Sequence, residues 1–223
     1  MAQQSSPIRD ARVNAVLDGL HKRGRSELPG VVAHVAGRAL RRLLTRKSGG
    51  GDPGRFDDVR YYNDKLICID REQGALIYLL CRSLKATRIV EYGTSFGVST
   101  LYLASAVRDN GGGTVIGTEL EPSKVRAARK NFEDAGLSSL IDLREGDALE
   151  TLKDCGGPVD FLLIDGWPKL AATVVTLVAP QLRSRAIVLC DEAAYRGVVR
   201  DPANGFVSVH LPLFRGTEIS VKV

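Results

Sequence analysis

Short apolar segments that alternate with helical patterns constrain the fold of this 223-residue chain more than any other feature. Five segments have the length and composition of buried strands, at residues 88–92, 114–118, 140–144, 159–164 and 186–190. Strands that are apolar on both faces and joined by helices form a parallel sheet that is covered on both sides. The sequence therefore predicts a doubly wound α/β protein.

Helix signals fill the intervals between these segments, at residues 70–84, 99–109, 122–135, 147–153 and 168–182. Asp70 and Gln73 have the spacing of a capping box, and Pro122 suits the first turn of a helix that Gly136 ends. The tail differs from this pattern, because two strands at 206–213 and 217–223 flank a short turn. The chain is therefore expected to end in a β-hairpin.

The N-terminal part of the chain has a different character. Residues 31–47 place apolar side chains at the helical period and arginines on the other face, and a shorter helix is expected over 8–22. Residues 48–54 are rich in glycine and read as a flexible linker. We therefore expect a basic helical extension at 1–47, a linker at 48–55 and one domain at 56–223.

Charge and composition limit the functional classes. The first 60 residues contain 12 Lys and Arg against 6 Asp and Glu, whereas the remaining residues contain 19 against 20. A basic helix attracts nucleic acid or acidic partners, but more often it is a solvated face. No segment is long and apolar enough to span a membrane, and the N-terminus lacks a secretory pattern, so a cytoplasmic protein is expected. The four cysteines are scattered, which argues against a disulfide framework or a zinc site.

Polar residues follow three consecutive strands at the edge of the sheet where ligands bind. The first strand leads into a turn at 91–99 with two glycines four residues apart, which lets a ligand approach the backbone closely. The second strand ends at Glu119, where a carboxylate can accept the two hydroxyls of a ribose, and the third ends at Asp147. Glu121 competes for the ribose, but its position suits a helix cap. Together these residues predict an adenosine site.

These segments carry a resemblance to a known family. Residues 90–99, 115–122, 144–147, 160–167 and 188–192 are similar to those of class I methyltransferases that use S-adenosylmethionine (SAM), most of all the catechol and caffeoyl-CoA O-methyltransferases. The resemblance implies a Rossmann-like sheet of seven strands whose last strand is antiparallel. It also implies a set of cofactor-binding residues, which comprises Glu91, Gly93, Ser95, Ser99, Glu119, Asp147, Ala148, Asp165 and Trp167.

The resemblance implies a metal site as well, with one departure from the family pattern. Catechol-type enzymes hold a divalent cation with two Asp and one Asn, and this chain has Asp165, Asp191 and Glu192 at those positions. All three are oxygen ligands of the kind that Mg²⁺ prefers, but the third carboxylate adds a negative charge. The alternative is that Asp191 caps a helix and Glu192 is solvated.

The base is a second departure. The family commonly has a lysine three residues after the first metal ligand, where this chain has Pro168 followed by Lys169. Asp165 and Lys169 are therefore the candidate catalytic residues. We predict methyl transfer from SAM to an oxygen atom of a small catechol-like acceptor, in a homodimer. The alternatives are metal-independent transfer to nitrogen or carbon, and a cofactor-binding module whose basic helices dock on nucleic acid or protein.

Overall fold

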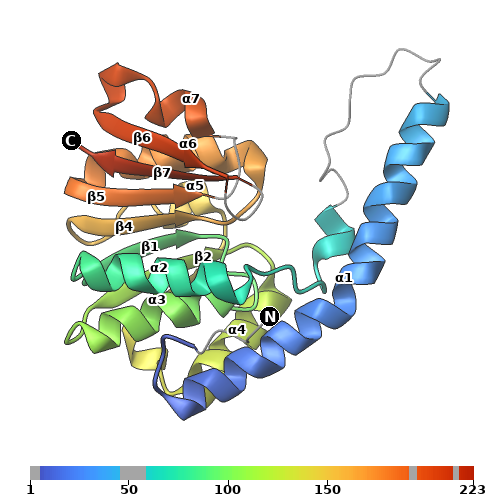
Figure 1. Ribbon diagram of the computed structural model, residues 1–223, viewed down its shortest axis with the longest axis horizontal. Coiled ribbons are helices and arrows are strands. Elements are labelled where there is room, and N and C mark those ends of the chain that lie inside the picture. The colour runs from blue at the N-terminus through green and yellow to red at the C-terminus, as the bar shows by residue number, and fades with distance from the viewer. Residues whose placement is uncertain (1–5, 46–58, 191–194, 213–215) are drawn as a thin grey trace.

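The computed structural model describes residues 6–45, 59–190, 195–212 and 216–223, which form a sheet with helices on both faces (Figure 1). Its strands are β1 Arg88–Tyr92, β2 Thr114–Glu119, β3 Ile141–Glu145, β4 Val159–Ile164, β5 Leu182–Cys190, β6 Phe206–Leu211 and β7 Thr217–Lys222. Their order is β3-β2-β1-β4-β5-β7-β6. Strands β1 to β5 are parallel, and β7 runs antiparallel to β5 and β6. The expected doubly wound sheet with its C-terminal hairpin is confirmed.

The main helices that cover the sheet are α2 Arg71–Ser83, α3 Val98–Asp109, α4 Pro122–Ala135, α5 Ala148–Thr151, α6 Pro168–Val178 and α7 Arg196–Val199. Side chains of α2, α3 and α4 contribute to one apolar core, and those of α6 and α7 to a second core on the opposite face. The expected caps are present. Asp70 accepts the amide of Gln73 at 2.8 Å, and Gly136 ends α4 with a left-handed φ of 72°.

The strand register brings the ends of the central strands together. Tyr92, the last residue of β1, pairs with Thr118 of β2 and with Ile164 of β4. The chain leaves β1 toward β2 on one side and returns to β4 on the other, so the strand order reverses at β1. Ligands of open α/β sheets bind at such a reversal, beyond the carboxyl ends of the strands.

A single helix, α1 Ala11–Thr45, replaces the two helices that the sequence pattern predicts. Pro29 and Gly30 read as helix breakers, yet the helix continues through Pro29. The N-terminal half packs against the body and buries Val13 and Leu17. Figure 1 shows the C-terminal half leaving the body. No described helix is both long enough and apolar enough to cross a membrane.

Candidate functional site

The turn between β1 and α3, which we call the β1 turn (residues 93–97), approaches the chain beyond β4 closely. Gly93, Ser95 and Gly97 have left-handed φ angles of 98°, 52° and 86°. A Cβ on Gly93 would lie 2.5 Å from the Cα of Gly166, a distance that real Cβ atoms do not show. Glycine at position 93 is therefore required both by the backbone conformation and by the neighbouring segment.

Glu91 places a buried carboxylate beneath the β1 turn. Its Oε2 accepts the hydroxyls of Thr94 and Thr100, the former at 2.9 Å. Its Oε1 is buried and accepts no well-aligned hydrogen bond from the residues that the structure describes. Burial raises the pKa of Glu91, and the hydroxyls of Ser99, Thr100 and Thr94 partly oppose this shift. An unsatisfied buried carboxylate oxygen fits a cationic donor such as an ammonium group.

Glu119 connects the end of β2 with the β1 turn. Its Oε2 accepts the amide of Ser95 at 2.8 Å, and its Oε1 accepts the amide of Glu121 at 2.9 Å. Each carboxylate oxygen has a second lone pair, so both can still accept a hydroxyl. Glu121 accepts the amide and the hydroxyl of Ser123 at the start of α4, which is the capping position expected for it.

The end of β3 lies beside the end of β2, because the amide of Gly146 donates to the carbonyl of Glu119 at 2.9 Å. The next residue, Asp147, caps α5 by accepting the amide of Leu149 at 2.9 Å. Its side chain is exposed, whereas the following Ala148 is buried. Asp147 and Ala148, both predicted to bind the cofactor, therefore lie at the same sheet edge as Glu119.

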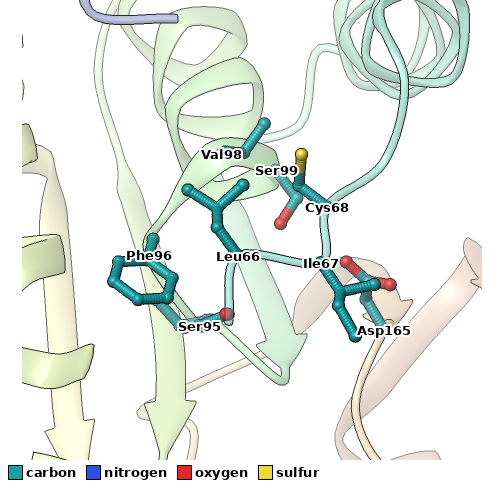
Figure 2. Close-up of a pocket in the computed structure, with 9 residues that line it drawn as sticks. Leu66, Ile67, Cys68, Ser95, Phe96, Val98, Ser99 and Asp165 are labelled. Carbon is teal, nitrogen blue, oxygen red and sulfur yellow. The ribbon is translucent and has the colours of Figure 1, made fainter. Parts of the chain in front are cut away.

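Asp165 and Trp167 follow β4. The amide of Asp165 donates to the carbonyl of Tyr92 at 2.9 Å, which fixes the segment next to β1. Figure 2 shows the Asp165 side chain at a pocket that Ser95 and Ser99 also line. The carbonyl of Trp167 accepts the hydroxyl of Tyr92 at 3.1 Å, and the side chain is partly buried. Lys169 lies in the first turn of α6 with an exposed side chain.

Sequence reasoning missed one side of this pocket. Leu66, Ile67 and Cys68, which precede α2, cross the pocket opposite the β1 turn (Figure 2). They carry no motif, because their place at the site depends on contacts with distant parts of the chain. Burial raises the pKa of Cys68 to about 11, so its thiol stays protonated at neutral pH.

The metal prediction falls largely outside the described residues. Asp165 borders the pocket, whereas Asp191 and Glu192 belong to the segment 191–194 that the structure does not describe. Within residues 6–45, 59–190, 195–212 and 216–223, no three His, Cys, Asp or Glu side chains gather as metal ligands would.

Comparison with known proteins identifies relatives. A family model described as a methyltransferase domain matches residues 90–193. The chain is 30% identical over 132 residues to a catechol O-methyltransferase of Mycobacterium tuberculosis, and the match covers 59% of each protein. It is 35% identical over 103 residues to a catechol O-methyltransferase of Niastella koreensis, with 44% of this chain and 46% of that protein covered. The match thus spans about half the length of these curated relatives.

Solved structures share the fold. An O-methyltransferase of Bacillus cereus in complex with SAH superimposes with a TM-score of 0.62 at 20% identity, over 83% of this chain and 97% of that chain. An O-methyltransferase of Streptomyces achromogenes involved in tomaymycin synthesis, in complex with SAM, superimposes with a TM-score of 0.60 at 24% identity. The match covers 74% of this chain and 85% of that chain. At identities of 20% and 24%, the similarity shows a shared fold.

Proposed function

We propose that the chain is a class I SAM-dependent methyltransferase, in the branch of the catechol and caffeoyl-CoA O-methyltransferases, and that it methylates a hydroxyl oxygen of a small acceptor. Two of the relatives are named catechol O-methyltransferases, so a catechol-like ring is the acceptor we infer. The observation that carries the proposal is the buried Oε1 of Glu91, which accepts no well-aligned hydrogen bond from the described residues and is suited to a cationic donor beneath the β1 turn.

The methyl donor would lie across the ends of β1, β2 and β3. The donor's ammonium group would pair with Glu91. Because Gly93 has no side chain, the donor's methionine chain would have room beside Ser95 and Ser99. Glu119 would accept the ribose hydroxyls with its remaining lone pairs. The adenine would lie near Asp147 and Ala148, where the exposed Asp147 is followed by the buried Ala148.

Methyl transfer from a sulfonium is an in-line displacement in which a carbon–oxygen bond forms as the carbon–sulfur bond breaks. The protein's main task is to align the acceptor oxygen with the methyl group. Trp167 would border both ligands, and Asp165 would take the acceptor's proton, with Lys169 as the second candidate. S-adenosylhomocysteine and the methylated acceptor are the products.

A divalent cation would assist this reaction, in keeping with the donor set. Asp165, Asp191 and Glu192 supply only carboxylate oxygens, which suit Mg²⁺ or Mn²⁺. When bound, the cation would lower the pKa of the acceptor hydroxyl. With the cation, Asp165, Asp191 and Glu192 would hold two neighbouring hydroxyls of the acceptor close to the methyl group of the donor.

A homodimer is the assembly that we propose, with the C-terminal half of α1 in the interface. Leu28, Val32 and Leu40 leave 47%, 57% and 58% of their surfaces exposed there. A second copy of this helix would cover the same stripe by symmetry.

The extension at 1–47, the linker at 48–55 and the domain at 56–223 remain the organisation that we propose.

Turnover tests the proposed function directly. Purified full-length protein would be incubated with isotopically methyl-labelled SAM and a panel of catechols, with monophenols and aromatic amines as comparison acceptors. The proposal expects O-methylated catechol and S-adenosylhomocysteine in equal amounts. If the aromatic amines are methylated and the catechols are not, the acceptor atom is a nitrogen and the proposed oxygen acceptor is wrong.

A further inference from the structure

Residues 61–69, which we call the strap, comprise the end of η1 Val59–Tyr62 and the segment that leads to α2, and residues 66–68 line the pocket. Leu66 and Cys68 of the strap face the pocket together with Ser95 and Ser99 (Figure 2). The enclosed volume between the strap and the β1 turn is about 10 Å³, roughly the space of one water molecule. The methionine end of the donor, proposed to lie beside Ser95 and Ser99, therefore requires the strap to shift.

Helix α1 holds the backbone of the strap through two side chains. Glu27 accepts the amide of Leu66 with Oε2 at 2.7 Å, and it accepts Nε of Arg23 with Oε1 at 2.7 Å. Arg23 donates from Nη2 to the carbonyl of Asp64 at 2.9 Å. The Arg23–Glu27 pair is partly exposed, so these contacts can open at modest cost in free energy.

The same turn of α1 also contacts the strap side chains and the β1 turn. A Cβ on Gly24 would lie 2.9 Å from Cδ2 of Leu66 and 3.2 Å from Sγ of Cys68. The guanidinium of Arg23 stands over the ring of Phe96, 4.2 Å from its centroid. Phe96 belongs to the β1 turn, so α1, the strap and this turn form one packed unit.

The other end of the strap links α1 to Trp167. The ring of Tyr61 stacks on His34 of α1 at 3.5 Å with an angle of 5°, and its hydroxyl donates to the carbonyl of Gly30 at 3.0 Å. The neighbouring Tyr62 meets Trp167 edge to face, with 5.6 Å between the ring centroids. Helix α1 thus reaches the residue that borders both ligands in the proposed reaction.

We propose that α1 controls entry and release of the methyl donor, with Arg23 and Glu27 as positioning residues that hold the strap against the bound nucleoside. The inference rests on the proposed function and deepens it. Loosening the strap removes contacts that confine the nucleoside, and it leaves Glu91 and Glu119 unchanged. The expected signature is therefore faster release of S-adenosylhomocysteine.

Gly24→Leu separates this role from a general effect on folding. Leucine is a better helix former than glycine, so α1 itself is not weakened, whereas the larger side chain pushes against Leu66 and Cys68. Gly19→Leu is the matched control, because a Cβ there meets nothing within 4 Å. Release of tritium-labelled S-adenosylhomocysteine, chased with unlabelled compound, is the readout. We expect release roughly tenfold faster in Gly24→Leu and unchanged in Gly19→Leu.

Glu27→Ala tests the same inference without added volume. It removes the acceptor for Leu66 and the partner of Arg23, whereas Glu27→Gln keeps an oxygen for the amide and should restore part of the slow release. Lys22→Ala, at an exposed position of α1, is the control. Wild-type release rates in both Gly24→Leu and Glu27→Ala would overturn the inference while leaving the proposed function intact. Absence of binding to wild-type protein would instead overturn the proposed function.

Discussion

The carboxylate of Glu119 at the end of β2 accepts the backbone amide of Ser95 in the β1 turn, with 2.8 Å between Oε2 and N. Ser95 has a left-handed φ of 52°, which costs a non-glycine residue roughly 1–2 kcal/mol. The bond therefore helps to hold the turn in its observed shape. The carboxylate proposed for the ribose and the turn proposed for the donor's methionine end are thus parts of one structure.

Replacing Gly93 by alanine should damage both the fold and the site. Gly111→Ala is the matched control, because its φ is 104° but a Cβ there meets no atom within 4 Å. The control should lose roughly 1–2 kcal/mol of unfolding free energy, the cost of left-handed backbone. Gly93→Ala should lose more, because its Cβ would also meet the backbone of Gly166 at 2.5 Å. Urea unfolding gives the unfolding free energy of both variants. Equal losses of free energy would contradict a close contact between Gly93 and Gly166.

His21 should make stability depend on pH. Burial lowers its pKa from 6.5 to about 4, with smaller contributions from Arg71 and Arg25. Between these values the unfolded chain binds a proton that the folded protein excludes, so unfolding free energy falls as pH drops from 6.5 toward 4. The loss is at most about 3 kcal/mol, at ~1.36 kcal/mol per pKa unit.

His21→Gln should flatten that part of the pH profile, because glutamine does not titrate. Urea unfolding at a series of pH values between 7 and 4 gives the comparison for wild type and variant. A variant with the same pH slope as wild type would show that other groups cause the dependence.

The metal proposal predicts that activity requires Mg²⁺ or Mn²⁺ and disappears with a chelator. Asp191→Ala should abolish turnover and spare nucleoside binding, because the proposed donor contacts lie at the ends of earlier strands. Glu192→Asn should keep metal-dependent turnover, since an amide oxygen can still bind the cation. Full turnover in chelator would reject the metal and leave Asp165 and Lys169 to manage the acceptor's proton.

The dimer proposal predicts that charges on the exposed stripe of α1 separate the subunits. Val32→Glu combined with Leu40→Glu would place two carboxylates in the interface, at a desolvation cost that no described partner offsets. Gly37→Glu adds a charge at a position with open space around it and should leave the mass unchanged. Light scattering of all three proteins is the measurement, and a monomeric wild type would reject this interface.

The sheet and the polar strand ends could be predicted because both follow from local patterns. Glu91, Glu119 and Asp147 lie at or just beyond the carboxyl ends of β1, β2 and β3, and parallel strands bring these ends to one edge. The course of α1 could not be predicted, because Pro29 and Gly30 indicate a break, whereas the helix continues through Pro29. The strap was missed for a related reason, since Leu66 reaches the pocket through contacts with Glu27 and Gly24, about 40 residues away.

The most direct test of cofactor binding is calorimetric titration of the wild-type protein with S-adenosylhomocysteine, after removal of any co-purified nucleoside. We expect one binding site per chain. Glu119→Ala should weaken binding by roughly 1.5–3 kcal/mol, the contribution of hydrogen bonds to a charged group. Glu121→Ala, which alters only the cap of α4, should leave the affinity close to that of wild type. No heat of binding with folded wild-type protein, or equal affinity in wild type and Glu119→Ala, would contradict a nucleoside site at the end of β2.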